Sequence, residues 1–512
     1  MKPELSRRDV LKLLSTGLAG QLLKPGMDRL NLRQPASGQP NILIIVFDAW
    51  TAKNISFMGY ERQTMPALES LLDKAIVFHN HYSAAPFTTP GTASLLTGRY
   101  PWSHGAVYGG GKLHLGTAGR NIFRLLEDDY HRVAYSHNSF TDVLLRQLKP
   151  DLDQYVERDA LYIDKDLLFD DLLVNDFEIV NLVRQVSIFD YVAPFQSSLL
   201  LQRIYLGLRD LKGKSWEKSF PLGLPLMGNV ALRFVLEEAI DWLGENIRQW
   251  PEPFLGYFHF LPPHSPYHTR FEFIDRFKDD GYQPLRKPVH PLSFNYTTEE
   301  MDDARKAYDE FLLYVDAEFA RLFDQLDRQG ILDNTWIFLT SDHGEMFERG
   351  EIEHTTQLLH QPVIRVPLMV FAPGQAERVD VYEPTSAVDL LPTILTLAGR
   401  QIPEWCDGLP LLGEESGLGH SRPIYAFEAK LNPVSEPLNV FTLTKIQNGY
   451  KAMIAEGYDG LEAPLEFAYH LEDDPEELEN LLDTDPSTAA DLLDDLQAEL
   501  PEISRRFMES KN

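Results

Sequence analysis

The stretch that decides the fold is Asn41-Ile-Leu-Ile-Ile-Val-Phe-Asp48. Its successive residues are apolar, which predicts a strand buried on both faces, as at the centre of a parallel sheet covered by helices. The run ends abruptly in the acid Asp48. Ligands of such sheets bind beyond the carboxyl ends of the strands, so Asp48 is a candidate site residue, although an acid there is more often a helix cap or turn residue.

Strand and helix patterns alternate along the rest of the chain. Further strands are predicted at 132–135, 254–260, 335–340 and 366–371, and helices at 65–76, 92–96, 121–127, 231–247 and 301–329. This order predicts a doubly wound α/β fold with a mostly parallel sheet and helices on both faces. After Gly399, short strands at 423–429 and 450–455 and an acidic helix at 487–508 predict a smaller C-terminal α+β subdomain.

The charge of the chain limits its partners. The 512 residues include 47 Lys and Arg against 77 Asp and Glu, a formal net charge of −30. We therefore expect no nucleic-acid partner, and an anionic substrate would need a locally cationic pocket. The single cysteine, Cys406, forms neither an intramolecular disulfide nor a cysteine-based zinc cluster.

The N-terminus resembles an export signal. Ser6-Arg-Arg-Asp-Val-Leu-Lys12 precedes an apolar run at 13–23, as in twin-arginine signals. We expect export to the periplasm or the medium, with cleavage or retention of the signal left open; the alternative is a basic helix start in a cytoplasmic protein. The body lacks an apolar run of membrane-spanning length, so we expect no transmembrane helix there.

Two strings carry residues suited to chemistry. Thr340-Ser-Asp-His-Gly-Glu345 follows an apolar strand, and its adjacent carboxylate and imidazole suit a divalent cation. In Thr88-Thr-Pro-Gly-Thr92, the simplest interpretation is a helix capped by the threonine before Pro90. The same geometry would aim a hydroxyl and free backbone N–H groups at one spot, where a metal-bound hydroxyl can attack an ester.

These strings resemble a known family. NILIIVFDAW, TTPGTASLLTGRYPWSHGA, PFLGYFHFLPPHSPY, the segment ending in LTSDHGE, IRVPLMVFAPG, SAVDLLPTILTLAG and AYHLEDDPEELENLLD follow the order of the sulfatase branch of the alkaline phosphatase superfamily, from about residue 40 to 482. The resemblance implies an alkaline-phosphatase-like fold. Together with the N-terminal signal pattern, the weak periodicity at about 150–225 and the change of pattern after Gly399, this predicts three parts: a signal segment and linker (1–38), a sulfatase-like catalytic domain (39–400) with an insertion at about 150–225, and a C-terminal subdomain with an acidic helical tail (401–512).

The chain departs from the family at its nucleophile. Sulfatases have Cys-x-Pro-x-Arg, or Ser for Cys, and oxidise the first residue to formylglycine, whereas Thr88 and Thr92 stand at the Cys and Arg positions here. Threonine cannot become formylglycine by that route. Phosphoglycerol and phosphoethanolamine transferases, relatives with threonine there, form a phospho-enzyme. The single acid in Asp48-Ala49 also resembles that branch and favours one metal ion, with Mn, Zn, Ca or Mg left open.

The resemblance assigns roles by position. The ion would be held by Asp48, Thr88, Asp342 and His343, with Thr88 as nucleophile. His264 would contact the transferred group or the leaving oxygen, and His354 would protonate that oxygen. A loop histidine in a Pro-rich turn is the simpler interpretation of His264, and His360 is expected on a helix surface.

Another string mimics a sulfate-binding motif of the family. Gly111-Lys-Leu-His-Leu-Gly116 occurs too early in the chain, and Ser136-His-Asn138 occupies the strand end where that motif is expected. Lys112 and His114 are therefore interpreted as loop residues.

Three functions follow as hypotheses. The first is a metal-dependent phosphodiesterase or phosphotransferase acting through Thr88, with hydrolysis favoured. The alternatives are a sulfatase without formylglycine and a non-catalytic metal-binding homologue. In the first two cases the partner would be an anionic ester, with lipid-linked and glycan-linked alcohols both open.

Overall fold

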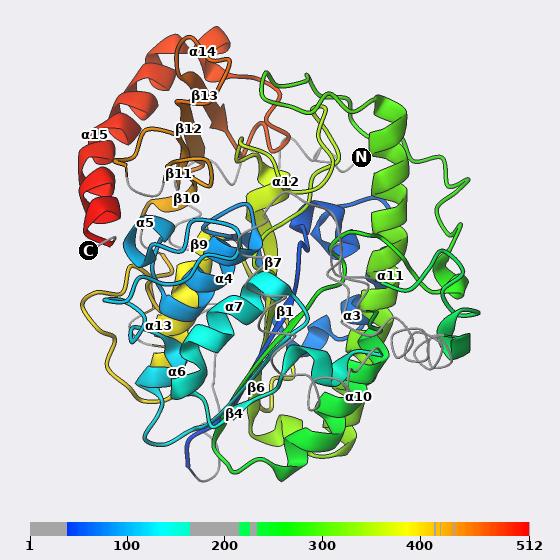
Figure 1. Cartoon of the computed structure of the whole chain (residues 1–512). Coiled ribbons are helices and arrows are strands. Elements are labelled where there is room, and N and C mark those ends of the chain that lie inside the picture. The colour runs from blue at the N-terminus through cyan, green and yellow to red at the C-terminus, as the bar shows by residue number, and fades with distance from the viewer. Residues whose placement is uncertain are drawn as a thin grey trace, which may run out of the picture.

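A computed structural model describes residues 38–163, 214–225, 233–413, 416–419, 421–433 and 436–510 of the chain (Figure 1). The expected signal segment therefore lies outside the described residues except for its last residue, and so does most of the expected insertion, 164–213. Among the described helices, none combines the length and apolar character needed to cross a bilayer.

The main sheet has nine strands in the order β4-β3-β5-β1-β6-β7-β2-β8, with β9 beside β2. β1 is parallel to both β5 and β6, and β7 is antiparallel to its neighbours β6 and β2. In sheet order the strands are β4 (Gln154–Tyr155), β3 (His131–Ser136), β5 (Phe254–Phe260), β1 (Asn41–Phe47), β6 (Thr335–Thr340), β7 (Arg365–Phe371), β2 (Ile76–Tyr82), β8 (Val379–Val381) and β9 (Thr385–Ser386). The predicted α/β fold with a mostly parallel sheet is confirmed.

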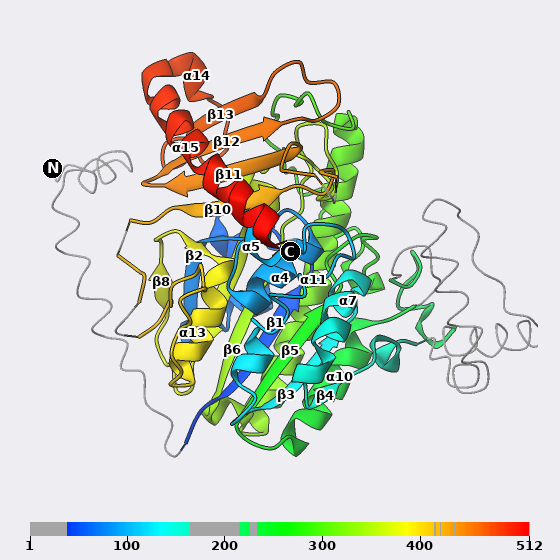
Figure 2. The same cartoon turned by 60° about the vertical axis from the view of Figure 1, so that its left-hand side comes forward.

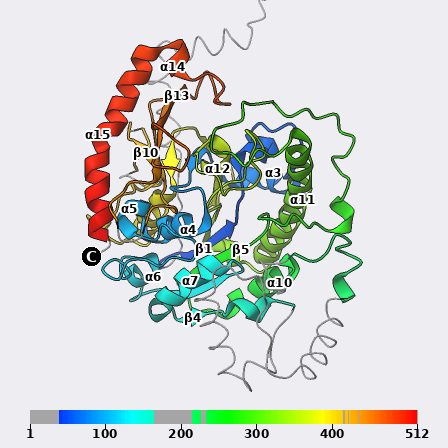
Figure 3. The same cartoon turned by 45° about the horizontal axis from the view of Figure 1, so that its top comes forward.

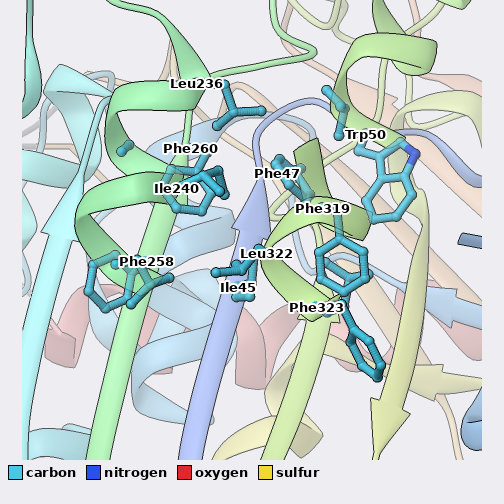
Figure 4. Packing of buried hydrophobic residues seen from close by; sticks show 14 of the residues in the cluster. Ile45, Phe47, Trp50, Leu236, Ile240, Phe258, Phe260, Phe319, Leu322 and Phe323 are labelled. Atoms are coloured by element: carbon cyan, nitrogen blue, oxygen red, sulfur yellow. The ribbon is translucent and has the colours of Figure 1, made fainter. Parts of the chain in front are cut away.

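Alternate residues of β1 enter two separate cores. Leu43, Ile45 and Phe47 face α3 (Pro66–Glu69), α10 (Leu236–Asn246) and α11 (Thr298–Arg328). Figure 4 shows α10 and α11 side chains, including Ile240 and Phe319, packed over Ile45 and Phe47. Ile42, Ile44 and Val46 face the other layer: α4 (Thr88–Thr97), α6 (Ile122–Leu125), α7 (Ser139–Leu148) and α13 (Leu390–Leu397). Burial on both faces is what an uninterrupted apolar strand requires.

The C-terminal part forms a second sheet. Its antiparallel order is β10 (Ile424–Glu428), β11 (Phe441–Gln447), β12 (Tyr450–Glu456) and β13 (Leu465–His470), followed by α14 (Leu481–Thr484) and α15 (Pro486–Ser510). α15 runs across this sheet, and its apolar residues share a core with the strands (Figure 2). It also contacts the short α5 (Pro101–His104) of the main domain. α15 and α11 lie on opposite sides of the molecule (Figure 3).

Two helix predictions need correction. The segment 65–76 is not one helix: α3 ends at Glu69, a 3-10 turn covers Leu72–Lys74, and Ile76 begins β2. Ile76 pairs with Val370 and Val379, so sheet formation overrides the helical spacing of the apolar residues. The helix predicted at 231–247 begins at Leu236, and residues 231–232 lie outside the described part.

The buried imidazole of His104 makes the fold acid-sensitive. Ala106 N donates to His104 Nδ1 at 3.1 Å, so the ring is held neutral, with Nε2 3.1 Å from Ser94 Oγ. Burial, helped by the charge of Arg99, lowers the pKa of His104 to about 3. In the unfolded chain the imidazole of His104 is protonated below about pH 6.5, whereas in the folded chain it stays neutral down to about pH 3. The free energy of unfolding therefore falls as the pH drops from about 6.5 toward 3.

We expect His104 to lower the free energy of unfolding of the wild-type protein by about 2 kcal/mol when the pH changes from 7.5 to 5. His104→Asn retains an acceptor for Ala106 N but cannot titrate in this range. Urea unfolding of both proteins at the two pH values measures the difference. An equal loss of stability in both proteins would contradict this account.

Candidate active site

The expected metal ligands meet at the carboxyl ends of β1 and β6. Asp48 follows β1, Asp342 and His343 follow β6, and all three are fully buried. One ligand atom from each lies within 4.8 Å of the others. His343 Nε2 is 3.3 Å from Asp48 Oδ1 and 3.7 Å from Asp342 Oδ2. The parallel pairing of β1 with β6 produces this convergence.

Each of these side chains turns one atom toward the other two. Asp342 Oδ1 accepts from Ala49 N and His343 N, while Asp48 Oδ1 and Asp342 Oδ2 are buried without a hydrogen-bond partner. His343 Nδ1 donates to Gly344 O at 2.9 Å, which leaves Nε2 with the lone pair in the neutral ring. Buried carboxylate oxygens without partners are costly unless a cation pairs with them. The donor set therefore fits a divalent metal ion.

The charges inside the cluster are strongly coupled. Burial raises the pKa of Asp342, and the neighbouring Asp48 charge adds to this. Burial acts in the same direction on Asp48, but the neighbouring imidazoles of His259 and His343 outweigh it and hold the pKa of Asp48 well below the usual value. Despite burial, the charges of Asp342 and Asp48 raise the pKa of His343 to about 9. Metal binding would release the proton that His343 otherwise holds.

Two residues missed by the sequence analysis orient Asp48. His259 Nε2 lies 3.0 Å from Asp48 Oδ2, and Asn138 Nδ2 donates to the same oxygen. Asn138 also donates to Thr88 Oγ1 at 3.2 Å. His259 stands near the end of the mostly apolar run 254–260, and this is the sequence signal that could have found it; in the structure it pairs with Val46 of β1. Outer-shell donors of this kind fix the ligand oxygen left for the metal.

Thr88 joins the cluster from the first turn of α4. Its Oγ1 lies 3.3 Å from His343 Nε2. The expected threonine cap before Pro90 is wrong: Phe87 is the N-cap and makes no side-chain hydrogen bond, so α4 begins at Thr88. Thr89 Oγ1 instead accepts from Gly110 N at 3.0 Å. The structure thus brings the hydroxyl of Thr88, rather than that of Thr89, to the metal ligands, at the positive end of the helix dipole.

Gly91 allows this close approach, because a Cβ there would lie 2.3 Å from the backbone oxygen of Asp342. Gly91→Ala is expected to push α4 away from the end of β6 and lower kcat about a hundredfold, as a displacement near 1 Å does. Steady-state kinetics measure the effect. Gly119→Ala is the matched control, since a Cβ at Gly119 meets nothing within 4 Å. Unchanged kcat in Gly91→Ala would contradict the assignment of Thr88.

The two expected acid–base histidines lie beside the cluster. The ring centroid of His354 is 4.2 Å from that of His343 and 4.8 Å from that of His264. His354 Nδ1 is 2.9 Å from Glu345 Oε1. Burial, followed by His343 and His264, lowers the pKa of His354, whereas burial raises the pKa of Glu345 well above its usual value. Both shifts favour the neutral form of the group. His264 is half-buried.

The prediction that His360 lies on a helix surface is wrong. The residue is buried at the start of α12 (Gln361–Ile364). Its Nδ1 lies 3.2 Å from Glu477 Oε2, so a residue of the C-terminal part covers it. The segment carrying Lys112 and His114 has no helix or strand, and hydrogen bonds between Leu113 and Gln147 hold it against α7.

Thr92, at the position of the family's arginine, has its Oγ1 3.3 Å from Thr141 Oγ1. No cation thus replaces the arginine at this position.

The sheet carries acids, an imidazole and a hydroxyl at its carboxyl edge, an arrangement that fits an α/β protein with a metal site there. The chain belongs to the sulfatase family, because that family's model, described as Sulfatase, matches residues 40–400. The resemblance seen in the sequence is thereby confirmed at the level of the family.

Among curated proteins, the choline-sulfatase of Rhizobium meliloti (strain 1021) is 26% identical over 470 residues, covering 87% of this chain and 83% of that protein. The multifunctional alkaline phosphatase superfamily protein PehA of Trinickia caryophylli is 26% identical over 433 residues, covering 73% and 77%.

Among solved structures, the phosphonate monoester hydrolase SpPMH from Silicibacter pomeroyi has a TM-score of 0.64 at 18% identity, covering 91% of this chain and 96% of that one. BT4656 in complex with its substrate D-glucosamine-2-N,6-O-disulfate has a TM-score of 0.62 at 16% identity, covering 92% and 98%. These likenesses show the fold alone.

Proposed function

We propose that this sulfatase-family chain hydrolyses anionic esters, with Thr88 as the acceptor of the transferred group. The observation that carries the proposal is the hydroxyl of Thr88, 3.3 Å from His343 Nε2 and beside two carboxylate oxygens without hydrogen-bond partners. Asp48, Thr88, Asp342 and His343 would hold one divalent ion. Once bound, such an ion lowers the pKa of the coordinated hydroxyl and polarises the ester oxygen.

The side chains themselves then account for both halves of the reaction. The hydroxyl of Thr88 loses its proton to solvent, its oxygen, held by Asn138, attacks the sulfur or phosphorus atom, and the bond from that atom to the leaving oxygen breaks. The leaving oxygen takes a proton from the Glu345–His354 pair. Water then gives a proton back to His354 and attacks the group on Thr88, which releases the acid anion and restores the hydroxyl.

Sulfate esters are the substrate class that the comparisons support best. The choline-sulfatase of Rhizobium meliloti is similar over 87% of this chain. This similarity favours the sulfatase alternative over the phosphodiester hypothesis that the sequence put first.

Phosphodiesters are the second candidate class, favoured by the residue at position 88. A threonine hydroxyl forms a phosphothreonine that water cleaves by a second displacement, without the aldehyde hydrate that sulfatases use. PehA, named a multifunctional member of the superfamily, is a relative at 26% identity. Both classes present an anionic tetrahedral centre to the same four ligands.

Parallel assays test the proposal. Purified protein loaded in turn with Mn, Zn, Ca or Mg would be incubated with 4-nitrophenyl sulfate and with bis(4-nitrophenyl) phosphate. We expect metal-dependent release of nitrophenol, faster from the sulfate. A faster reaction with the phosphodiester selects the second class. No release from either ester with any ion would contradict the function and favour a non-catalytic homologue.

We also propose that the chain is exported, on the basis of Arg7-Arg8 and the apolar run at 13–23. Fractionation of the source cells should find the protein outside the cytoplasm. Its retention there would contradict this proposal without bearing on the reaction.

A further inference from the structure

The C-terminal sheet docks directly on the segment that leads into α4. Phe427 N, in the edge strand β10, donates to Ala84 O at 2.9 Å, four residues before Thr88. Ala84 and Phe427 belong to one buried apolar cluster with Trp102. The chain that leaves β10 therefore passes close to the nucleophile segment.

The turn after β10 is held firmly. The buried carboxylate of Glu428 accepts from Lys430 N at 2.8 Å and from the hydroxyl of Tyr458. Asn432 Oδ1 accepts from Asn439 N at 2.8 Å and Val440 N at 3.0 Å, which ties the far end of the loop. These hydrogen bonds fix the position of Lys430 in the turn.

That position lies beside the candidate active site. Lys430 Nζ donates to Thr355 O at 3.0 Å, and Thr355 is the exposed residue that follows His354. The ammonium also lies 5.7 Å from the ring centroid of Phe87, the residue before Thr88. Lys430 therefore contacts the chain neighbours of both the expected nucleophile and the expected acid.

The ammonium of Lys430 has hydrogen-bonding capacity to spare. Within the described part of the chain, no carboxylate forms a salt bridge with it, and Thr355 O uses one of its three N–H donors. Burial lowers the pKa of Lys430, while Glu428 and Glu351 act in the opposite direction. In a chain of net charge −30, a lysine beside the site supplies the local positive charge that an anionic substrate needs.

We propose that Lys430 binds a negatively charged substituent on the alcohol portion of the substrate. The inference rests on the proposed function and deepens it. The transferred group lies at Thr88 and the metal ligands, whereas Lys430 stands on the side of His354, where the leaving oxygen takes its proton. The substrate class is then an ester whose alcohol carries a carboxylate or a second sulfate or phosphate group.

The test compares a matched pair of esters, 2-nitrophenyl sulfate and 5-carboxy-2-nitrophenyl sulfate, and the corresponding phosphodiesters if those react faster. Lys430→Met is expected to lower the ratio of kcat/KM for the carboxylated ester to that for the plain ester about tenfold. The change in this ratio cancels the intrinsic reactivities of the esters. Lys430→Arg should keep most of the ratio, and Lys112→Met, at an exposed residue, should not change it.

A binding measurement keeps this inference separate from the reaction. Calorimetric titration with 3-hydroxy-4-nitrobenzoate and with 2-nitrophenol, the two product alcohols, should show tighter binding of the carboxylated one to wild type and loss of that preference in Lys430→Met. If no ester is turned over, the proposed function fails, yet the titration still decides the role of Lys430. The inference would be overturned if Lys430→Met lowered kcat/KM equally for both esters. It would also be overturned if Lys430→Met changed neither the ratio of kcat/KM values nor the preference in binding.

Discussion

Replacing Thr88 with alanine is expected to lower kcat/KM at least about a thousandfold, because it removes the only oxygen that takes the transferred group in this account. The fold should persist, since Thr88 makes no capping bond and Asn138 keeps its bond to Asp48. Steady-state kinetics and thermal unfolding measure the two effects.

The neighbouring threonine provides the matched control. Thr89 is equally buried, but its hydroxyl accepts from Gly110 N rather than facing the metal ligands. Thr89→Ala should change stability slightly and leave most of the activity, and Thr88→Ser should retain measurable turnover through its own hydroxyl. Full activity in Thr88→Ala would remove this residue as nucleophile.

Replacing Asp342 with asparagine is expected to abolish metal binding and, with it, turnover. The amide side chain would keep an acceptor for Ala49 N and His343 N, so the loop after β6 should stay in place. It would lose the charge on the side where Oδ2 has no hydrogen-bond partner. Elemental analysis after dialysis should find one ion per wild-type chain and less than about a tenth of that in the variant, the loss expected when a ligand set is broken.

Chelation gives an independent readout of the same site. Metal saturating wild type at 100 to 1,000 times its dissociation constant adds roughly 3–4 kcal/mol of stability, so a chelator should lower the melting temperature of wild type and not that of Asp342→Asn. Asp153→Asn is the control, because Asp153 pairs with Arg132 near the start of β3. Normal metal content in Asp342→Asn would contradict the assigned ligands.

The sequence predicted best where local pattern and tertiary environment agree. The strands at 254–260 and 335–340 have the predicted bounds, since runs rich in large apolar side chains are stable only at a central position in the sheet. The convergence of Asp48 with Asp342 and His343 followed from the rule that parallel strands end at one edge.

Features that depend on distant contacts could not be predicted in this way. His360 is buried because Glu477, more than a hundred residues later, packs against it. Ile76 belongs to β2 because two other strands pair with it there. The role of Lys430 depends on how the second sheet docks beside Ala84, which no local pattern contains.

The central claim is that Thr88 carries the transferred group, and mass spectrometry tests it most directly. The metal-loaded protein would be mixed with a reactive sulfate ester or phosphodiester, quenched in acid within the first turnovers and digested. The account predicts that the peptide containing Thr88 carries one sulfuryl or phosphoryl group on that side chain, and that the group disappears when the ester is exhausted. A Thr88 peptide that stays unmodified under every quench time during active turnover, or the group on another residue, would contradict it.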